Sequence, residues 1–124
     1  MAQRIVVVED TSEILMLFDE ILTEEGFEIV PLASPLLALE KIISVRPDLV
    51  ILDYIFDREA YGWQLLQALK LHRETTHIPV IVCTGALRLA QEIDGYLATR
   101  EVTLLAKPFS IDELLAAVQQ ALSG

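Results

Sequence analysis

Four of the apolar runs in this sequence end at side chains whose types suit phosphoryl chemistry. The first run is followed by Glu9 and Asp10, the third by Asp53, the fourth by Thr84 and the fifth by Lys107. Ligands of open parallel sheets bind beyond the carboxyl ends of the strands, so we expect these side chains to converge at one rim. Three carboxylates repel one another unless a cation lies among them, and Mg²⁺ prefers such oxygen ligands. The pattern therefore predicts an acidic, magnesium-binding pocket.

Asp53 is the side chain that we expect to react in this pocket. A carboxylate beside a metal can attack a phosphoryl group and form an acyl phosphate. Mg²⁺ and the Lys107 ammonium would neutralise charge on the transferring group, and the Thr84 hydroxyl would donate to a phosphoryl oxygen. Taken singly, each residue has a commoner structural role, such as helix cap, turn residue or solvated lysine. Their joint occurrence at the ends of separate strands favours a phospho-acceptor site.

The elements that must position these residues are five short apolar runs and the helical patterns between them. Most of the runs are β-branched or continuous rather than alternating, which is typical of parallel strands buried on both faces. The predicted strands are Ile5–Val8, Phe27–Leu32, Leu49–Leu52, Val80–Cys83 and Val102–Ala106.

A helical pattern follows each run. Gly26 is a stop for the first helix, Ser34 before Pro35 is a cap for the second, and the fifth begins at a capping box. The predicted helices are Ser12–Glu25, Ser34 to a point before Pro47, Gly62–His72, Leu87–Thr99 and Ser110–Leu122. Five strand–helix units with right-handed crossovers predict an α/β fold, a doubly wound five-stranded parallel sheet with helices on both faces. We expect one domain over residues 1–124, with no output domain in this chain.

Composition excludes several classes of protein. The chain is 53% apolar, which argues against disorder, and no apolar run approaches the roughly 18–20 residues of a membrane span. Without a signal-peptide pattern, a cytoplasmic location is expected. The net charge of −10 disfavours direct nucleic-acid binding. Cys83 is the sole cysteine and lies in an apolar run, so we expect a core thiol rather than a disulfide or a zinc ligand.

These motifs together resemble the receiver domain of two-component response regulators, and the resemblance covers the whole chain. It rests on Val7–Asp10, Asp48–Asp53, Cys83–Gly85 and Lys107–Phe109. The resemblance implies a flavodoxin-like strand order. It also implies a cis peptide bond between Lys107 and Pro108.

The family resemblance assigns a role to each site residue. Asp53 would accept phosphate from a sensor histidine kinase or a phosphotransfer protein, and the chain would then switch a downstream protein target. Thr84 and Lys107 would contact the phosphoryl group. The implied Mg²⁺ ligands are Glu9, Asp10, Asp53 and the backbone carbonyl of Ile55. Such a chain is a signalling module and not a metabolic enzyme, with neither nucleic acid nor membrane as a partner; a homodimer is left open.

The sequence departs from the family pattern beside the acceptor and on the fifth strand. The segment 54–62 is longer and more charged than usual, and the positions of the family's switch aromatic hold Leu104 and Leu105. Ile55 and Ala86 are apolar and cannot hold a water by hydrogen bonding, so we hypothesise slow loss of phosphate. Gly95 interrupts the predicted fourth helix, which leaves the usual partner surface in question.

Three other functions compete with that of a phosphorylated receiver. A degenerate receiver would bind partners without phosphorylation. The missing switch aromatic and the altered loop favour it, and the intact acid, threonine and lysine set opposes it. A flavodoxin-like enzyme is opposed because no glycine-rich phosphate cradle follows the first strand, where Glu9 and Asp10 would repel phosphate. A haloacid-dehalogenase-like phosphatase would need an aspartate at the position of Ile55.

Overall fold

The five apolar runs form one parallel sheet in the computed structural model, which describes residues 2–34, 37–53, 61–85 and 101–123. The strand order is β2-β1-β3-β4-β5, the flavodoxin-like order that the receiver resemblance implies. The chain leaves β1 toward β2 on one side and returns to β3 on the other, so the direction of winding reverses beside β1. The strands are β1 (Arg4–Val8), β2 (Glu28–Leu32), β3 (Leu49–Asp53), β4 (Val80–Thr84) and β5 (Val102–Ala106).

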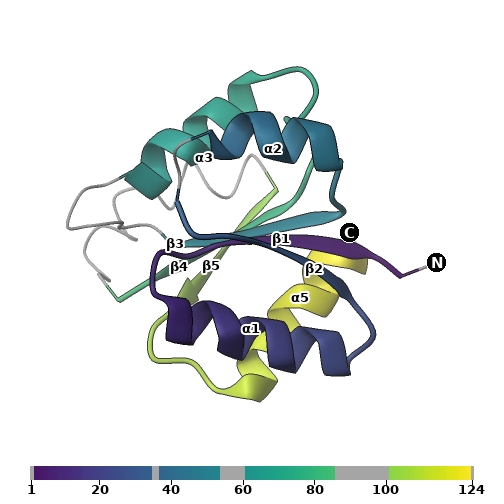
Figure 1. Ribbon diagram of the computed structural model, residues 1–124, viewed down its shortest axis with the longest axis vertical. Helices are drawn as coiled ribbons and strands as arrows, with labels where there is room; N and C mark the ends of the chain where they lie inside the picture. The colour runs from purple at the N-terminus through teal and green to yellow at the C-terminus, as the bar shows by residue number, and fades with distance from the viewer. Residues whose placement is uncertain (1, 35–36, 54–60, 86–100, 124) are drawn as a thin grey trace.

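Helices cover both faces of this sheet. One face packs against α1 (Ser12–Glu24) and α5 (Ile111–Ser123), and the other packs against α2 (Ala38–Val45) and α3 (Tyr61–Leu71), as Figure 1 shows. The predicted helix over 87–99 lies outside the described residues. No helix of the described part of the chain is long and apolar enough to cross a membrane.

Each central strand supplies two separate cores because successive side chains of a strand point to opposite faces. Val6 and Val8 of β1 pack into the core beneath α2 and α3. Ile5 and Val7, which alternate with them in sequence, pack into the core beneath α1 and α5. All four side chains are fully buried, which explains why this strand is continuously apolar.

Two helix ends follow their sequence signals. Gly26 has a φ of 94°, and the N–H groups of Gly26 and Phe27 donate to the carbonyls of Thr23 and Leu22, which closes α1 with a Schellman motif. At the start of α5, the Glu113 N–H donates to the Ser110 hydroxyl at 3.1 Å, and the Ser110 N–H donates to the Glu113 carboxylate at 3.0 Å. The predicted capping box is therefore confirmed.

The start of α2 was predicted wrongly. The helix begins at Ala38 rather than at Ser34, and its N-cap is Leu37, which has a left-handed φ of 61° and makes no side-chain capping bond. The Ser34-Pro35 signal is local, whereas the helix begins where its side chains reach the core: Ala38 and Ile42 are buried. The predicted end before Pro47 is correct, since α2 ends at Val45.

Candidate functional site: an acidic rim with one lysine

The doubly wound order brings the carboxyl ends of β1 and β3 side by side. Val8, the last residue of β1, pairs with Leu52, and the next residues along the two strands are Glu9 and Asp53. Carboxylate oxygens of Glu9, Asp10 and Asp53 all lie within 4.8 Å of one another. The three acids that the sequence placed at one rim are thus brought together, although 43 positions separate Asp10 from Asp53.

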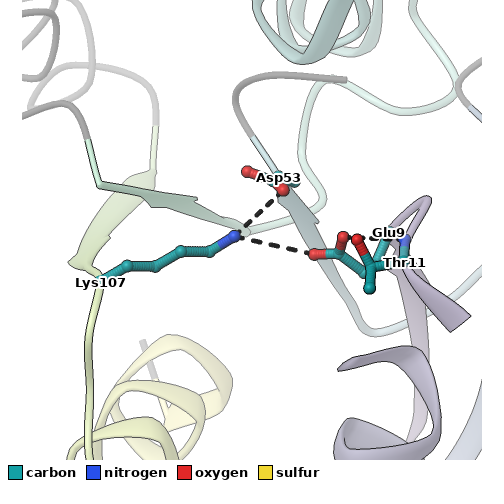
Figure 2. A network of polar contacts seen from close by, with 4 residues as sticks. All are labelled: Glu9, Thr11, Asp53 and Lys107. Atoms are coloured by element: carbon teal, nitrogen blue, oxygen red, sulfur yellow. Dashed lines mark hydrogen bonds and ion pairs between the residues drawn. The ribbon is translucent and has the colours of Figure 1, made fainter. Parts of the chain in front are cut away.

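Lys107 reaches this cluster from the end of β5. Its Nζ donates to Asp53 Oδ2 at 3.0 Å and lies 3.8 Å from Glu9 Oε2. Figure 2 shows the ammonium between the two carboxylates, which come from different strands. Backbone pairing of β4 with β5 positions Lys107 at the rim, since the Lys107 N–H donates to the Thr84 carbonyl at 2.8 Å.

Glu9 is the most deeply buried acid of the cluster, with 2% of its surface exposed. Burial raises the pKa of Glu9 to about 7, and the neighbouring Asp53 charge and an Asp10 hydrogen bond add to this rise. The Thr11 N–H, which donates to Glu9 Oε1 at 3.2 Å, and the Lys107 charge act in the opposite direction. The site therefore holds more negative charge than one lysine compensates.

Lys107 remains an ammonium in this setting. Burial lowers its pKa, but the hydrogen bond to Asp53 and the charges of Asp53 and Glu9 outweigh burial, so the net change is upward. A fixed positive charge beside Asp53 is what a group carrying anionic oxygens would need at this position.

Thr84 is the buried hydroxyl at the end of β4, with 3% of its surface exposed. It pairs with Ala106, the residue before Lys107, so the hydroxyl and the ammonium belong to adjacent strands at the same rim. Cys83, one residue earlier and paired with Asp53, is buried in the core as predicted. Burial raises the pKa of the Cys83 thiol to about 12.

Ile55, the predicted carbonyl ligand, and Ala86 lie outside the described residues, as do Gly95 and most of the charged segment after Asp53. The expected cis bond between Lys107 and Pro108 is present. Leu105 is buried and Leu104 partly buried, so aliphatic packing occupies the two positions where the family carries its switch aromatic.

The bond from Thr11 to Glu9 was not expected from sequence. The N-cap of α1 is Thr11, whose side chain makes no capping bond. The Glu9 side chain reaches forward along the chain to accept the Thr11 N–H. Glu9 and Asp10 both lie just before α1, so their sequence positions do not show which of them accepts this bond.

Comparison with known proteins identifies the family. Residues 5–119 match the family described as "Response regulator receiver domain". The chain is 33% identical over 122 residues to sporulation initiation phosphotransferase F of Bacillus subtilis, which covers 98% of this chain and 95% of that protein. It is 32% identical over 119 residues to the phosphate regulon transcriptional regulatory protein PhoB of Escherichia coli, covering 96% of this chain and 51% of that protein. The chain thus spans about half the length of PhoB.

Solved structures agree with the sequence matches. A putative response regulator from Chloroflexus aurantiacus superposes with a TM-score of 0.86 at 26% identity, over the whole of both chains. The signal receiver domain of a histidine kinase from Syntrophus aciditrophicus superposes with a TM-score of 0.85 at 26% identity, covering 99% of this chain and 92% of that one. The chain therefore belongs to the response regulator receiver domain family, the signalling modules of two-component systems.

Proposed function

We propose that Asp53 is the phospho-acceptor of this receiver and that it takes its phosphoryl group from a histidine kinase or a phosphotransfer protein. One observation supports this most: Asp53 lies among two further carboxylates and is hydrogen-bonded to Lys107 at 3.0 Å. The name of the Bacillus subtilis relative, a phosphotransferase, points to the same chemistry.

The residues at the rim fit a magnesium ion. Three carboxylates within 4.8 Å of one another form the oxygen-rich, anionic donor set that hard divalent cations prefer. Burial, followed by the Asp53 charge, raises the pKa of Glu9, and a divalent cation among these oxygens would favour the charged carboxylate instead. We propose Glu9, Asp10 and Asp53 as ligands, with the Ile55 carbonyl as a further ligand from the sequence. When bound, Mg²⁺ would neutralise the anionic oxygens of the transferring group.

The chain's own groups supply the remaining chemistry. An Asp53 carboxylate oxygen attacks phosphorus, the bond from phosphorus to the donor histidine nitrogen breaks, and the imidazole leaves with the electron pair of that bond. Lys107 orients the Asp53 carboxylate and then offers its ammonium to a phosphoryl oxygen. Thr84 donates its hydroxyl to another phosphoryl oxygen at the same rim. The turnover of a metabolite is not part of this scheme.

The proposal is tested by incubating the protein with Mg²⁺ and acetyl phosphate and measuring its intact mass. We expect one added phosphoryl group in the wild type and none in Asp53→Asn. Asp112→Asn, which changes an exposed acid in the first turn of α5, is the matched control and should be labelled like the wild type. Equal labelling of Asp53→Asn would reject the acceptor assignment.

The same samples test the hypothesis of slow phosphate loss drawn from Ile55 and Ala86. We expect the added mass to persist well beyond the time of the labelling reaction after acetyl phosphate is removed in magnesium buffer. Loss within seconds would contradict that hypothesis while leaving the acceptor assignment intact.

A further inference from the structure

Lys107 lies one residue beyond the end of β5, at the limit of the hydrogen bonds that hold this strand in the sheet. Its N–H donates to the Thr84 carbonyl, which fixes the backbone on the strand side. Its side chain extends from there to the carboxylates of Asp53 and Glu9, as Figure 2 shows. A lysine stem is flexible, so the position of the ammonium also depends on what holds the chain after Lys107.

The stem of Lys107 receives little lateral support from the neighbouring strand end. Gly85 is the residue beside it, and a Cβ at that position would lie 3.8 Å from the Lys107 Cβ. Glycine has no such atom, so this flank of the stem lacks a side-chain contact that any other residue would provide. The direction of the stem is therefore set largely by the backbone at Lys107 itself.

Phe109, two residues further on, anchors that backbone in the core. Its ring is partly buried and packs into the core beneath α1 and α5, the two helices on one face of the sheet in Figure 1. There it meets Phe18 of α1, with ring centroids 5.9 Å apart and ring planes inclined by 43°. This separation lies in the range of about 4.5 to 7 Å in which tilted aromatic pairs attract each other. Phe18 is 3% exposed and thus offers a fixed surface.

The neighbours of Phe109 do not share this task. Pro108 is exposed and has no N–H to donate. Ser110 is exposed as well, and its side chain is used in the capping box of α5. Between Lys107 and the start of α5, the Phe109 ring is therefore the side chain that enters the core.

We propose that Phe18 and Phe109 are positioning residues for phosphoryl transfer, since their ring contact holds the Lys107 backbone where the ammonium reaches Asp53. Neither ring touches the reacting atoms. A displacement of about 1 Å in a positioned group can slow a reaction about a hundredfold, and the flexible lysine stem would absorb part of such a shift. This inference rests on the proposed function of Asp53.

The test separates positioning from a purely structural role with matched variants. Phe109→Leu and Phe18→Leu each remove one ring of the pair, whereas Phe109→Tyr keeps the ring at a partly exposed position. The control is Phe27→Leu, which makes the same change in the same core but at the amino end of the sheet, between α1 and β2. Urea denaturation of all four variants first defines conditions in which every protein is folded.

Acetyl phosphate with saturating Mg²⁺ then gives the rate of phosphorylation of each folded protein. We expect this rate to fall about tenfold in Phe109→Leu and in Phe18→Leu, and to stay near the wild-type rate in Phe109→Tyr and Phe27→Leu. In a Lys107→Met background, Phe109→Leu should cause no further fall, because the ring acts through the ammonium.

Calorimetric titration with Mg²⁺ supplies a second measurement that does not depend on phosphorylation. The two leucine variants of the pair should bind Mg²⁺ at least as tightly as the wild type, because an ammonium drawn away from Asp53 and Glu9 competes less with the cation. Weaker binding would show that the rings shape the acid cluster rather than position Lys107, and it would overturn the inference.

Three other results would also overturn it: wild-type rates in folded Phe109→Leu and Phe18→Leu, an equal fall in Phe27→Leu, or a full tenfold fall in the Lys107→Met background. Failure of the proposed function has a different signature, because acetyl phosphate would then not label the wild type at all.

Discussion

A lysine lies at each end of the sheet, one partly and one almost fully buried, and the hydrogen bonds described for the two lysines differ in kind. At the carboxyl end, Lys107 Nζ lies between the carboxylates of Asp53 and Glu9. At the amino end, Lys70 is 5% exposed and donates to the backbone carbonyls of Ile78 at 2.7 Å and Thr76 at 3.2 Å. The two carbonyl bonds of Lys70 tie the end of α3 to the start of β4, whereas Lys107 lies in a cluster of carboxylates.

The surroundings of Lys70 support this contrast. The Thr75 hydroxyl donates to the Leu69 carbonyl at 2.6 Å, and the Thr76 hydroxyl donates to the Lys70 carbonyl at 2.9 Å. These bonds satisfy carbonyls that the end of α3 leaves without helical partners. Several hydrogen bonds thus join α3 to the start of β4 at the amino end, while the acidic rim gathers three carboxylates around one ammonium.

The largest effect should come from Lys107→Met, measured as the rate of phosphorylation by acetyl phosphate. We expect a fall of about a hundredfold, the usual result of removing one charged donor from a transferring group. Lys41→Met, which removes an exposed lysine from α2, should keep the wild-type rate. If Lys107→Met were phosphorylated at the wild-type rate, the proposed role of Lys107 in phosphoryl transfer would be wrong.

Lys70→Met should act on stability instead. The change leaves two carbonyl groups without a charged donor, and we expect a loss of about 2 to 3 kcal/mol in the free energy of unfolding, measured by urea denaturation. The folded Lys70→Met variant should be phosphorylated at the wild-type rate. The urea concentration at which Lys107→Met unfolds should be closer to that of the wild type than the concentration at which Lys70→Met unfolds. Slow phosphorylation of a fully folded Lys70→Met protein would contradict the division of roles.

Glu9→Gln should stabilise the magnesium-free protein in a pH-dependent way. Because the pKa of Glu9 is raised to about 7, its contribution to stability is full below the unfolded value of 4.5 and is lost as pH rises through 7. The neutral glutamine has no such loss, so the variant should gain on the wild type as the pH rises from 4.5 through 7, by about 3 kcal/mol at pH 8. Urea denaturation of both proteins, in the presence of a chelator at pH 4.5 and pH 8, measures the difference in their free energies of unfolding. A gain that does not change with pH would show that the raised pKa of Glu9 is not its cause.

The smallest effect concerns Cys83, whose thiol should react only very slowly with a thiol reagent in the folded protein. Its pKa of about 12 keeps the thiol protonated at pH 8, so a thiol reagent should label it only as fast as the rim opens or the chain unfolds. Lys70→Met should speed this labelling in proportion to its loss of stability. Rapid labelling of the folded wild type would show that the carboxyl ends of β3 and β4 are more open than the structure indicates.

The strands and the rim were predictable because they depend on patterns that tertiary structure does not override. A continuous apolar run such as Val80–Cys83 suits a strand buried on both faces, and a polar residue at its carboxyl end must then lie at the ligand-binding rim. The sequence therefore predicted the gathering of Asp10, Asp53 and Lys107, and the family match agrees with the fold that gathers them.

The start of α2 and the role of Lys70 were not predictable in the same way. Ser34-Pro35 is a strong local start signal, yet the chain uses a left-handed turn at Leu37 before the helix can place Ala38 in the core. A lysine near the end of a helix is normally solvated. Lys70 is buried because the α3–β4 connection folds back over it and brings the carbonyls of Thr76 and Ile78 to its ammonium.

The central claim is that Asp53, and no other acid of the rim, carries the phosphoryl group. After labelling with acetyl phosphate and Mg²⁺, borohydride reduction converts a phosphorylated aspartate to homoserine, and peptide mass spectrometry locates that residue. We predict homoserine at position 53 alone, with Asp10 and Glu9 unchanged. Homoserine at position 10 or at another acid, with Asp53 intact, would contradict the account.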